Sequence, residues 1–330
     1  MTEAVLQRST WGHILARPAF LAGAVIVAGY VAVALVAPLL YPGDLGGLPY
    51  DLHLLQTCGI APGPTLRGPH PLGETQFMGY DVAAGLVVGS RWDLFLVAAI
   101  TGPSAVLGTS AGLTAAGYGG KVDWLLMTVT DAVLAIPYFV FVILFVILLS
   151  PRVPTAWGPM LFVSAMVLVL WAPYSRGVRG EASRVVALPF VEASRAAGAS
   201  LGRVLRRHIL PNSLAPVLAQ IPITVAMTLA LVVGVQFVVT MANLQSAAFC
   251  GFGTVGSAVA PVVPVYNYPE WGLILAAGSV DWAPAPGTNF LSGPWWGFVF
   301  PALWIALFGI GVILLCDGLG TGISARSRTG

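Results

Sequence analysis

The chain has 330 residues, of which 57% are hydrophobic and only 8% are charged, and its formal net charge is +2. Soluble domains carry about 25% charged residues, so this composition excludes a protein whose whole surface faces water. Because the chain also lacks the alternating pattern of a membrane β-barrel, we expect an all-α polytopic membrane protein.

Six apolar runs are long enough to cross the hydrocarbon core of a bilayer, which takes about 20 residues as a helix. The predicted transmembrane helices cover about residues 19–40, 93–116, 124–149, 157–174, 214–242 and 296–316. The first run is longer than the core of a signal peptide, and no convincing small-x-small cleavage site accompanies it. We therefore expect an uncleaved first helix rather than a cleaved signal peptide.

The basic residues indicate the orientation of the chain, because Lys and Arg concentrate on cytoplasmic segments. Placing the N-terminus inside assigns twelve of the fifteen Lys and Arg residues to the cytoplasm. These are Arg8, Arg17, Lys121, Arg176, Arg179, Arg184, Arg195, Arg203, Arg206, Arg207, Arg326 and Arg328, whereas Arg67, Arg91 and Arg152 fall outside. We expect both termini to be cytoplasmic.

The predicted helices divide the chain into three parts. Residues 1–92 hold a cytoplasmic lead, the first transmembrane helix and a Pro/Gly-rich external loop. Residues 93–320 form the main transmembrane domain, with a cytoplasmic loop at 175–213 and an external loop at 243–295, and residues 321–330 form a cytoplasmic tail.

The third predicted helix contains two notable residues. Pro137 should kink it by removing a helix hydrogen bond, and the kink either lines a pathway or only shapes the packing. Asp131 lies two turns inside the run, where a carboxylate is costly in lipid. It is either a proton or substrate-cation site, or a structural acid bonded to a helix terminus or an arginine. We favour the structural acid, because Asp131 is shallow and has no second acid at helical spacing.

The cytoplasmic loop contains a short predicted helix with a defined start and end. Pro189 suits a first turn, Glu192 lies near the positive N-terminus of the helix dipole, and Gly198 permits the turn that ends it. Small residues at 193, 194, 196 and 197 would let another protein approach the backbone. The basic cluster of this region comprises Arg176, Arg179, Arg203, Arg206 and Arg207.

The order of residues in this loop resembles the EAA loop of binding-protein-dependent ABC importer permeases. The residues that carry the resemblance, and that would contact the ATPase, are Glu192, Ala193, Ser194, Gly198, Ala199, Leu210 and Pro211. Residues 70–81 and 125–137 resemble the peptide and nickel branch of this family, and residues 171–181, 294–301 and 316–319 resemble the family more generally. The resemblance implies the type I ABC importer permease fold, with a short cytoplasmic coupling helix.

The chain departs from the family pattern in two places. In residues 70–81, Glu74 and Thr75 replace a Thr-Asp pair, and Tyr80 replaces an arginine, so an ion pair of that arginine cannot form here. The external loop at 243–295 matches less well. Its aromatic residues are expected mainly to anchor at the membrane interface, or else to meet a solute-binding protein or surround a gate; they are Tyr266, Tyr268, Trp271, Trp282, Trp295 and Trp296.

The resemblance implies a permease subunit that forms half of a translocation pathway in a prokaryotic cell membrane. Its partners would be a homologous second permease, two ATPases that bind ATP and Mg²⁺, an extracytoplasmic solute-binding protein and the lipid bilayer, and no nucleic acid. Peptides are the expected substrates, with oligosaccharides or nickel chelates as alternatives. An ion-coupled secondary transporter is a further alternative, but the fifth predicted helix carries no charge for such a mechanism.

Motifs for chemistry within this chain are missing from its sequence. No G-x-x-x-x-G-K-[ST] phosphate loop, H-E-x-x-H pattern or G-x-S-x-G elbow occurs, so we expect no catalytic residue, bound nucleotide or metal, and a membrane-embedded enzyme is not favoured. Cys58 and Cys250 both fall in predicted external loops, where oxidation is permitted. They either form a disulfide or stay unpaired.

Overall fold

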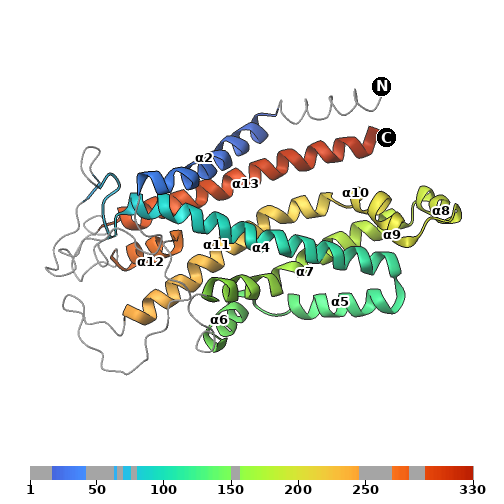
Figure 1. The fold of residues 1–330 in the computed structure, drawn as a ribbon, viewed down its shortest axis with the longest axis horizontal. Coiled ribbons are helices and arrows are strands. Elements are labelled where there is room, and N and C mark those ends of the chain that lie inside the picture. Colours follow the sequence, from blue (N-terminus) through green and yellow to red (C-terminus); the bar gives the residue numbers. More distant parts are fainter. Residues whose placement is uncertain are drawn as a thin grey trace.

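The computed structural model describes residues 17–41, 63–64, 70–75, 80–149, 157–244, 270–281 and 294–329. Within these ranges the chain is helical apart from turns, short connections and one isolated antiparallel bridge between Glu74 and Asp81. Long helices run side by side along the longest axis of the molecule, with α8 at one end and α12 near the other (Figure 1). The expected all-α architecture is confirmed.

The helices follow one another in a simple order. They are α2 (Pro18–Leu40), α4 (Val82–Tyr118), α5 (Gly120–Leu134), α6 (Tyr138–Leu149), α7 (Gly158–Val186), α8 (Pro189–Ala196), α9 (Leu201–Val204), the π-helix η3 (Leu205–Ile209), α10 (Leu210–Asn212), α11 (Ala215–Leu244), α12 (Trp271–Asp281) and α13 (Trp296–Thr329).

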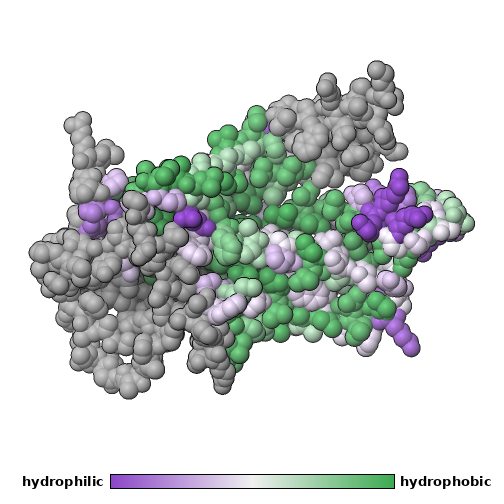
Figure 2. All heavy atoms as spheres, viewed as in Figure 1, coloured by the Kyte–Doolittle hydropathy of each residue, from purple (hydrophilic) through white to green (hydrophobic). Residues whose placement is uncertain are grey.

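Among the described residues, five helices are long and apolar enough to cross a membrane: α2, α4, α7, α11 and α13. The bent pair α5 and α6 supplies a sixth span if the two are counted together. The flank of the molecule between its two ends is largely hydrophobic, as a bilayer requires (Figure 2). The prediction of about six spans is therefore confirmed.

Three helix boundaries differ from the prediction. Helix α4 begins at Val82 rather than at 93, because the Asp81 side chain accepts a hydrogen bond from the amide of Ala84 at 2.9 Å and caps the helix. Helix α7 continues to Val186, and α13 runs on through most of the predicted tail to Thr329. The predicted external loop contains a helix, α12, that the sequence did not indicate.

Helices α4 and α7 form the closest pair of the bundle, and glycine makes their approach possible. A Cβ on Gly108 would lie 2.3 Å from the carbonyl oxygen of Trp171, and one on Gly112 would lie 2.6 Å from that of Ser175. Only a residue without a side chain fits at such distances, and small residues four apart are typical of membrane helix interfaces. The two backbones are therefore in direct contact.

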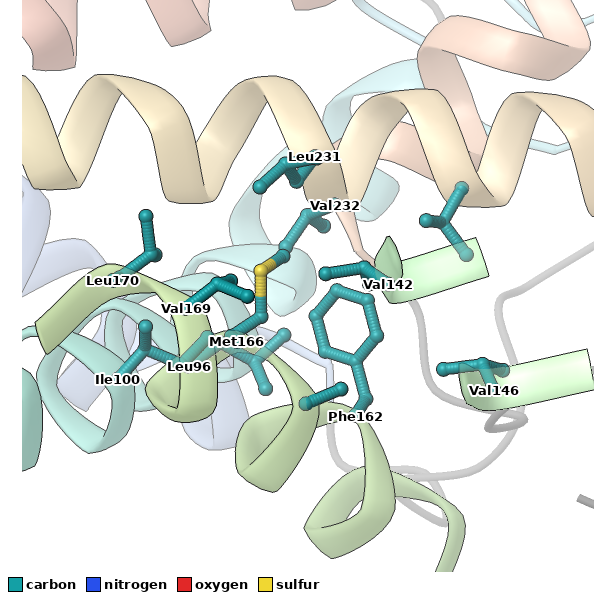
Figure 3. Close-up of a cluster of buried hydrophobic side chains, with 12 residues drawn as sticks. Leu96, Ile100, Val142, Val146, Phe162, Met166, Val169, Leu170, Leu231 and Val232 are labelled. Carbon is teal, nitrogen blue, oxygen red and sulfur yellow. The ribbon is translucent and has the colours of Figure 1, made fainter. Parts of the chain in front are cut away.

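A buried apolar cluster joins α4, α6, α7 and α11. Figure 3 shows Met166 of α7 beside Phe162 and Val169, with Val232 of α11 above it and Val142 of α6 beside the ring of Phe162. A second cluster lies where α2, α4, α11, α12 and α13 meet, and its members include Tyr30, Leu86, Trp271, Ile274 and Phe308.

The third span breaks at Pro137, as the sequence predicts. Helices α5 and α6 are bent by 82° across a break of a few residues. Pro137 has no amide hydrogen to donate to the carbonyl of Val133, which instead accepts from Ile136 at 3.2 Å. The two alternatives for this kink, lining a pathway or only shaping the packing, both stay predictions.

Candidate functional site

Helix α8 has a sharply defined start and end. It begins at Pro189, whose fixed φ suits a first turn, and it ends before Gly198, which has φ +81°. The amide of Ala199 donates to the carbonyl of Ser194 at 3.1 Å, and that of Gly198 to Arg195 at 2.9 Å. This is the Schellman pattern of a glycine-terminated helix, so Gly198 turns the chain from α8 toward α9.

Helix α8 is held by one buried side chain and exposes the rest of its surface. Val191 is fully buried, whereas Glu192 and Ala193 are exposed and Ser194 is half-buried. The buried cluster that receives Val191 consists of Ala182, Val185, Val204 and Ile209. Helix α8 therefore presents a short outward face of small and charged residues and the exposed ring of Phe190 at the end of the molecule (Figure 1).

The segment after α9 contains a π-helical turn. The amide of Leu210 donates to the carbonyl of Leu205, five residues back, immediately before Pro211, which cannot donate. The Leu205 side chain packs so closely on Gly117 of α4 that a Cβ there would lie 2.8 Å from it. Leu210 is half-buried and Pro211 is exposed. The predicted coupling residues thus occupy two connected helical turns at one end of the bundle.

The structure divides the predicted basic cluster into two groups. Arg203, Arg206 and Arg207 are exposed on α9 and η3, beside α8, and this end of the molecule is strongly hydrophilic in Figure 2. Arg176 and Arg179 lie farther along α7, where each meets an acid of α5. Only the first group lies directly beside α8, whereas the second lies on the part of α7 that leads to it.

The two ion pairs between α5 and α7 differ in geometry. Arg179 holds Asp123 with two hydrogen bonds, from Nε to Oδ1 at 3.0 Å and from Nη2 to Oδ2 at 2.6 Å. Arg176 contacts Asp131 once, from Nη1 to Oδ1 at 3.5 Å, and both of these side chains are more than half exposed. An arginine partner is what the structural-acid alternative expects, and the exposure of both side chains is what a substrate-cation site expects, so both alternatives for Asp131 stay predictions.

His70, near the start of α4, lies between two carboxylates. Nδ1 of His70 lies 2.9 Å from Oδ2 of Asp81, and its Nε2 lies 2.9 Å from Oε1 of Glu74. The carbonyl of Glu74 also accepts from the indole nitrogen of Trp296 at 2.9 Å. Since Asp81 caps α4 and Trp296 begins α13, His70 and Glu74 together link the starts of these two helices.

The expectation that Trp271 anchors at the membrane interface is wrong, because Trp271 is the buried first residue of α12. Its side chain is buried against Tyr30 and Phe308 and does not lie at a membrane interface. Its indole nitrogen donates to the carbonyl of Leu86 at 3.1 Å, and its amide donates to the Asp93 carboxylate at 2.9 Å. The sequence pattern that could have indicated this packing is the pair Trp271 and Gly272. Gly272 has no side chain, so it lets α12 approach α11 closely.

Several predicted features lie outside the described residues. They are the Cys58–Cys250 pairing and the positions of Tyr266, Tyr268, Trp282, Arg8, Arg67 and Arg152. Cys316, within the described part, is a free and buried thiol. In that same part no group of three or more His, Cys, Asp or Glu side chains could hold a metal ion.

Comparison with known proteins identifies the family. Residues 106–324, which include α8 and its flanking turns, match the family described as binding-protein-dependent transport system inner membrane component. The dipeptide transport system permease protein DppC of Alkalihalophilus pseudofirmus is 28% identical over 93% of this chain and 86% of that protein.

Two further relatives carry similar names. A putative peptide transport system permease protein of Brucella abortus is 31% identical over 76% of this chain and 71% of its own length. The oligopeptide transport system permease protein OppC of Haemophilus influenzae is 25% identical over 97% of this chain and 90% of its own length. The chain therefore belongs to the inner membrane components of binding-protein-dependent transport systems, and it is a multi-pass permease subunit of an ABC importer rather than an enzyme.

Proposed function

We propose that this permease subunit forms half of a translocation pathway for peptides. The observation that carries the proposal is the agreement among its relatives, which are named as dipeptide, peptide and oligopeptide permeases and align over most of the chain. Oligosaccharides and nickel chelates remain weaker alternatives, because none of these three relatives is named for them.

The second part of the proposal is that α8 docks on an ATPase subunit. An eight-residue helix with one buried anchor and an exposed face that combines Ala193 and Ala196 with the ring of Phe190 can enter a groove that accommodates that ring. Its partner ATPases would bind ATP and Mg²⁺ and supply the energy. The remaining partners would be a homologous second permease and an extracytoplasmic solute-binding protein.

The distribution of positive charge supports a cytoplasmic position for α8. Lys121 and seven arginines between 176 and 207 lie on α5, α7, α8, α9 and η3 or at their ends, and α2 begins and α13 ends on the same side of the molecule (Figure 1). Arg91 lies near the opposite end, in the first turns of α4. The positive-inside rule then assigns the α8 end to the cytoplasm of a prokaryotic cell.

Movement of α8 has a direct route into the bundle. Its anchor Val191 shares a buried cluster with Ala182 and Val185 of α7, and Leu205 in the following turn packs on Gly117 of α4. Closure of the ATPases would therefore displace α7 and α4 together. Transport would follow from a shift between inward-open and outward-open states that the ATPases bias.

Reconstitution tests the proposal. The chain with its second permease, ATPases and binding protein, in proteoliposomes, should accumulate a radiolabelled dipeptide or tripeptide only when ATP is supplied. Omission of the ATPases should abolish uptake. Uptake by this chain alone, driven by a proton or sodium gradient, would overturn the ATP-coupled mechanism. Uptake of an oligosaccharide or a nickel chelate, with no uptake of peptide, would overturn the assigned substrate class.

A further inference from the structure

The exposed side of α5 carries two different surfaces. Val122, Leu125 and Val129 form an aliphatic strip that is at least 40% exposed at each residue, as expected for contact with lipid. Thr128 and Asp131 are also exposed, but they lie to one side of that strip, because successive helical residues are separated by about 100°. Trp124, near the start of α5, is also exposed on the side of Thr128 and Asp131. Beyond Trp124, helix α5 thus has a polar exposed strip between its lipid-type strip and its contact with α7.

The neighbouring part of α7 continues the polar strip. Arg176, Gly180 and Ser183 are exposed there, and a Cβ on Gly180 would meet no atom within 4 Å. The two helices are joined behind the strip, where the buried Thr130 hydroxyl lies 3.4 Å from that of Ser175. Large apolar side chains are absent from this exposed part of α7, between residues 176 and 184, so it is unsuited to lipid.

The Asp131–Arg176 pair lies farther along the polar strip than Thr128. Asp131 is eleven residues from the start of α5, which places it about 16 Å along the helix axis. The side chains of Asp131 and Arg176 are 56% and 66% exposed. A charge at such a position is costly against lipid and normally faces water or protein. Since Arg176 lies at the start of the predicted cytoplasmic loop, the strip is suited to one wall of a water-filled pathway at its cytoplasmic mouth.

The pair also has unused capacity for hydrogen bonds. Its single contact is 3.5 Å long, whereas a carboxylate offers about four acceptor sites and a guanidinium five donors. The Asp123–Arg179 pair on the same two helices is instead bidentate. In an empty pathway the carboxylate of Asp131 and the guanidinium of Arg176 neutralise each other. Because their contact is long, each group can exchange it for a contact with a charged ligand.

We propose that Asp131 and Arg176 form a contact site in the pathway for the charged ends of a peptide, the first taking the ammonium group and the second the carboxylate. This inference depends on the proposed peptide substrate. Peptides of different sequence share only their backbone and their two ends, so a site for the ends serves them all. Two exposed and loosely held charges give weak binding, which lets a passing solute leave again.

The first test asks whether the polar strip faces water. In a chain with Cys58→Ser, Cys250→Ser and Cys316→Ala, a single cysteine is placed at Thr128 or at its neighbour Val129. The assembled complex is then treated with a membrane-impermeant thiol reagent. We expect Thr128→Cys to react at least tenfold faster than Val129→Cys. Equal or reversed rates would overturn the assignment of the strip to the pathway.

The second test separates the roles of the two charges. Three forms of one peptide that the wild-type complex takes up are compared: free, C-amidated and N-acetylated. Dividing the rate of each variant by the wild-type rate for the same form cancels the preference of the binding protein. Arg176→Gln should slow uptake of the free peptide about fivefold more than uptake of the amidated form. Asp131→Asn should slow uptake of the free peptide about fivefold more than uptake of the acetylated form. A factor of about five corresponds to the upper range of the interaction energy of an exposed ion pair.

The matched control is Asp123→Asn, which removes the other ion pair between α5 and α7 and should change all three forms by the same factor. Equal slowing of the three forms by Arg176→Gln and Asp131→Asn would show a structural pair or a contact with the second permease and would overturn the inference. Unchanged rates would overturn it as well. ATP-driven uptake of no peptide at all by the wild-type complex would instead refute the proposed function on which it rests.

Discussion

Val191→Ala should loosen α8 without unfolding the bundle. The Val191 side chain is fully buried in the small cluster that joins α7, α8, α9 and η3, and it is the only buried residue of α8. Removing two buried carbon groups costs about 0.8 kcal/mol each, and the cavity left behind raises the loss to about 2–3 kcal/mol. An isolated helix of eight residues is unstable in water, so α8 depends on its tertiary contacts, of which Val191 is the one fully buried and the contact of Phe190 with His208 is more exposed.

Hydrogen exchange measures this loss directly. The amides of Ala197, Gly198 and Ala199 are bonded to carbonyls of α8, and they should exchange roughly 50-fold faster in Val191→Ala, since 1.4 kcal/mol corresponds to a factor of ten. Recovery of the ATPase subunits with the permease should fall in parallel. Unchanged exchange at these three amides would refute the view that Val191 anchors α8.

Val186→Ala is the matched control for this experiment. Val186 is the last residue of α7, is half-buried, and packs on the rim of the same cluster. Val186→Ala removes the same two methyl groups as Val191→Ala, but it exposes less buried apolar area and leaves the Val191 side chain in place. Exchange of the α8 amides should therefore increase by less than tenfold. A loss as large as that of Val191→Ala would mean that the whole cluster, and not the single anchor, holds α8.

Two glycine substitutions give further expectations, each with its own control. Gly198→Ala places a side chain at φ +81°, which costs about 1 kcal/mol, and it should speed hydrogen exchange at the end of α8 about fivefold. The control Gly202→Ala lies within a helix and should not speed it. Equal effects of the two substitutions would contradict the role of the Gly198 turn. Gly108→Ala puts a Cβ 2.3 Å from a backbone oxygen of α7 and should lower the thermal stability of the purified protein by about 1–3 kcal/mol. Gly102→Ala, with no atom within 4 Å, should not, and similar unfolding temperatures for the two variants would contradict the close α4–α7 contact.

The sequence predicted the spans and the coupling segment because both depend on local rules. A helix in lipid needs a continuous apolar run, a proline removes a donor, and a helix that ends at a positive φ favours glycine. These rules located the break at Pro137 and the end of α8 at Gly198. The early start of α4 was also locally encoded, by the capping residue Asp81, but the charge of Arg91 within its first turns obscured the apolar run.

The sequence could not predict the features that depend on contacts between distant residues. Helix α12 has eleven residues, too few for a span, and it is positioned by the distant Asp93 and by close contact with α11 and α13. The contacts of His70 with Glu74 and Asp81 depend on the turn between them. Hydropathy does not report such contacts, because they depend on which helices meet and not on how apolar each one is.

The packing favours movement of α4, α7 and α12 as one body. Helix α4 has 37 residues, a length of about 55 Å at 1.5 Å per residue. Gly117 near one of its ends receives Leu205 from the coupling segment, and Asp93 toward the other caps α12. Between them, the backbone contacts of Gly108 and Gly112 with α7 leave no space for the two helices to slide past each other. A displacement of one helix is therefore transmitted to the other, as in any closely packed interior. Helices α5 and α6 are separated by an 82° bend and contact the α4–α7 pair through side chains, by the Asp123–Arg179 ion pair on α5 and by the buried Val142 on α6. A displacement of α8 would then move the α4–α7 pair first and reach the third span through these side chains and the Asp131–Arg176 contact.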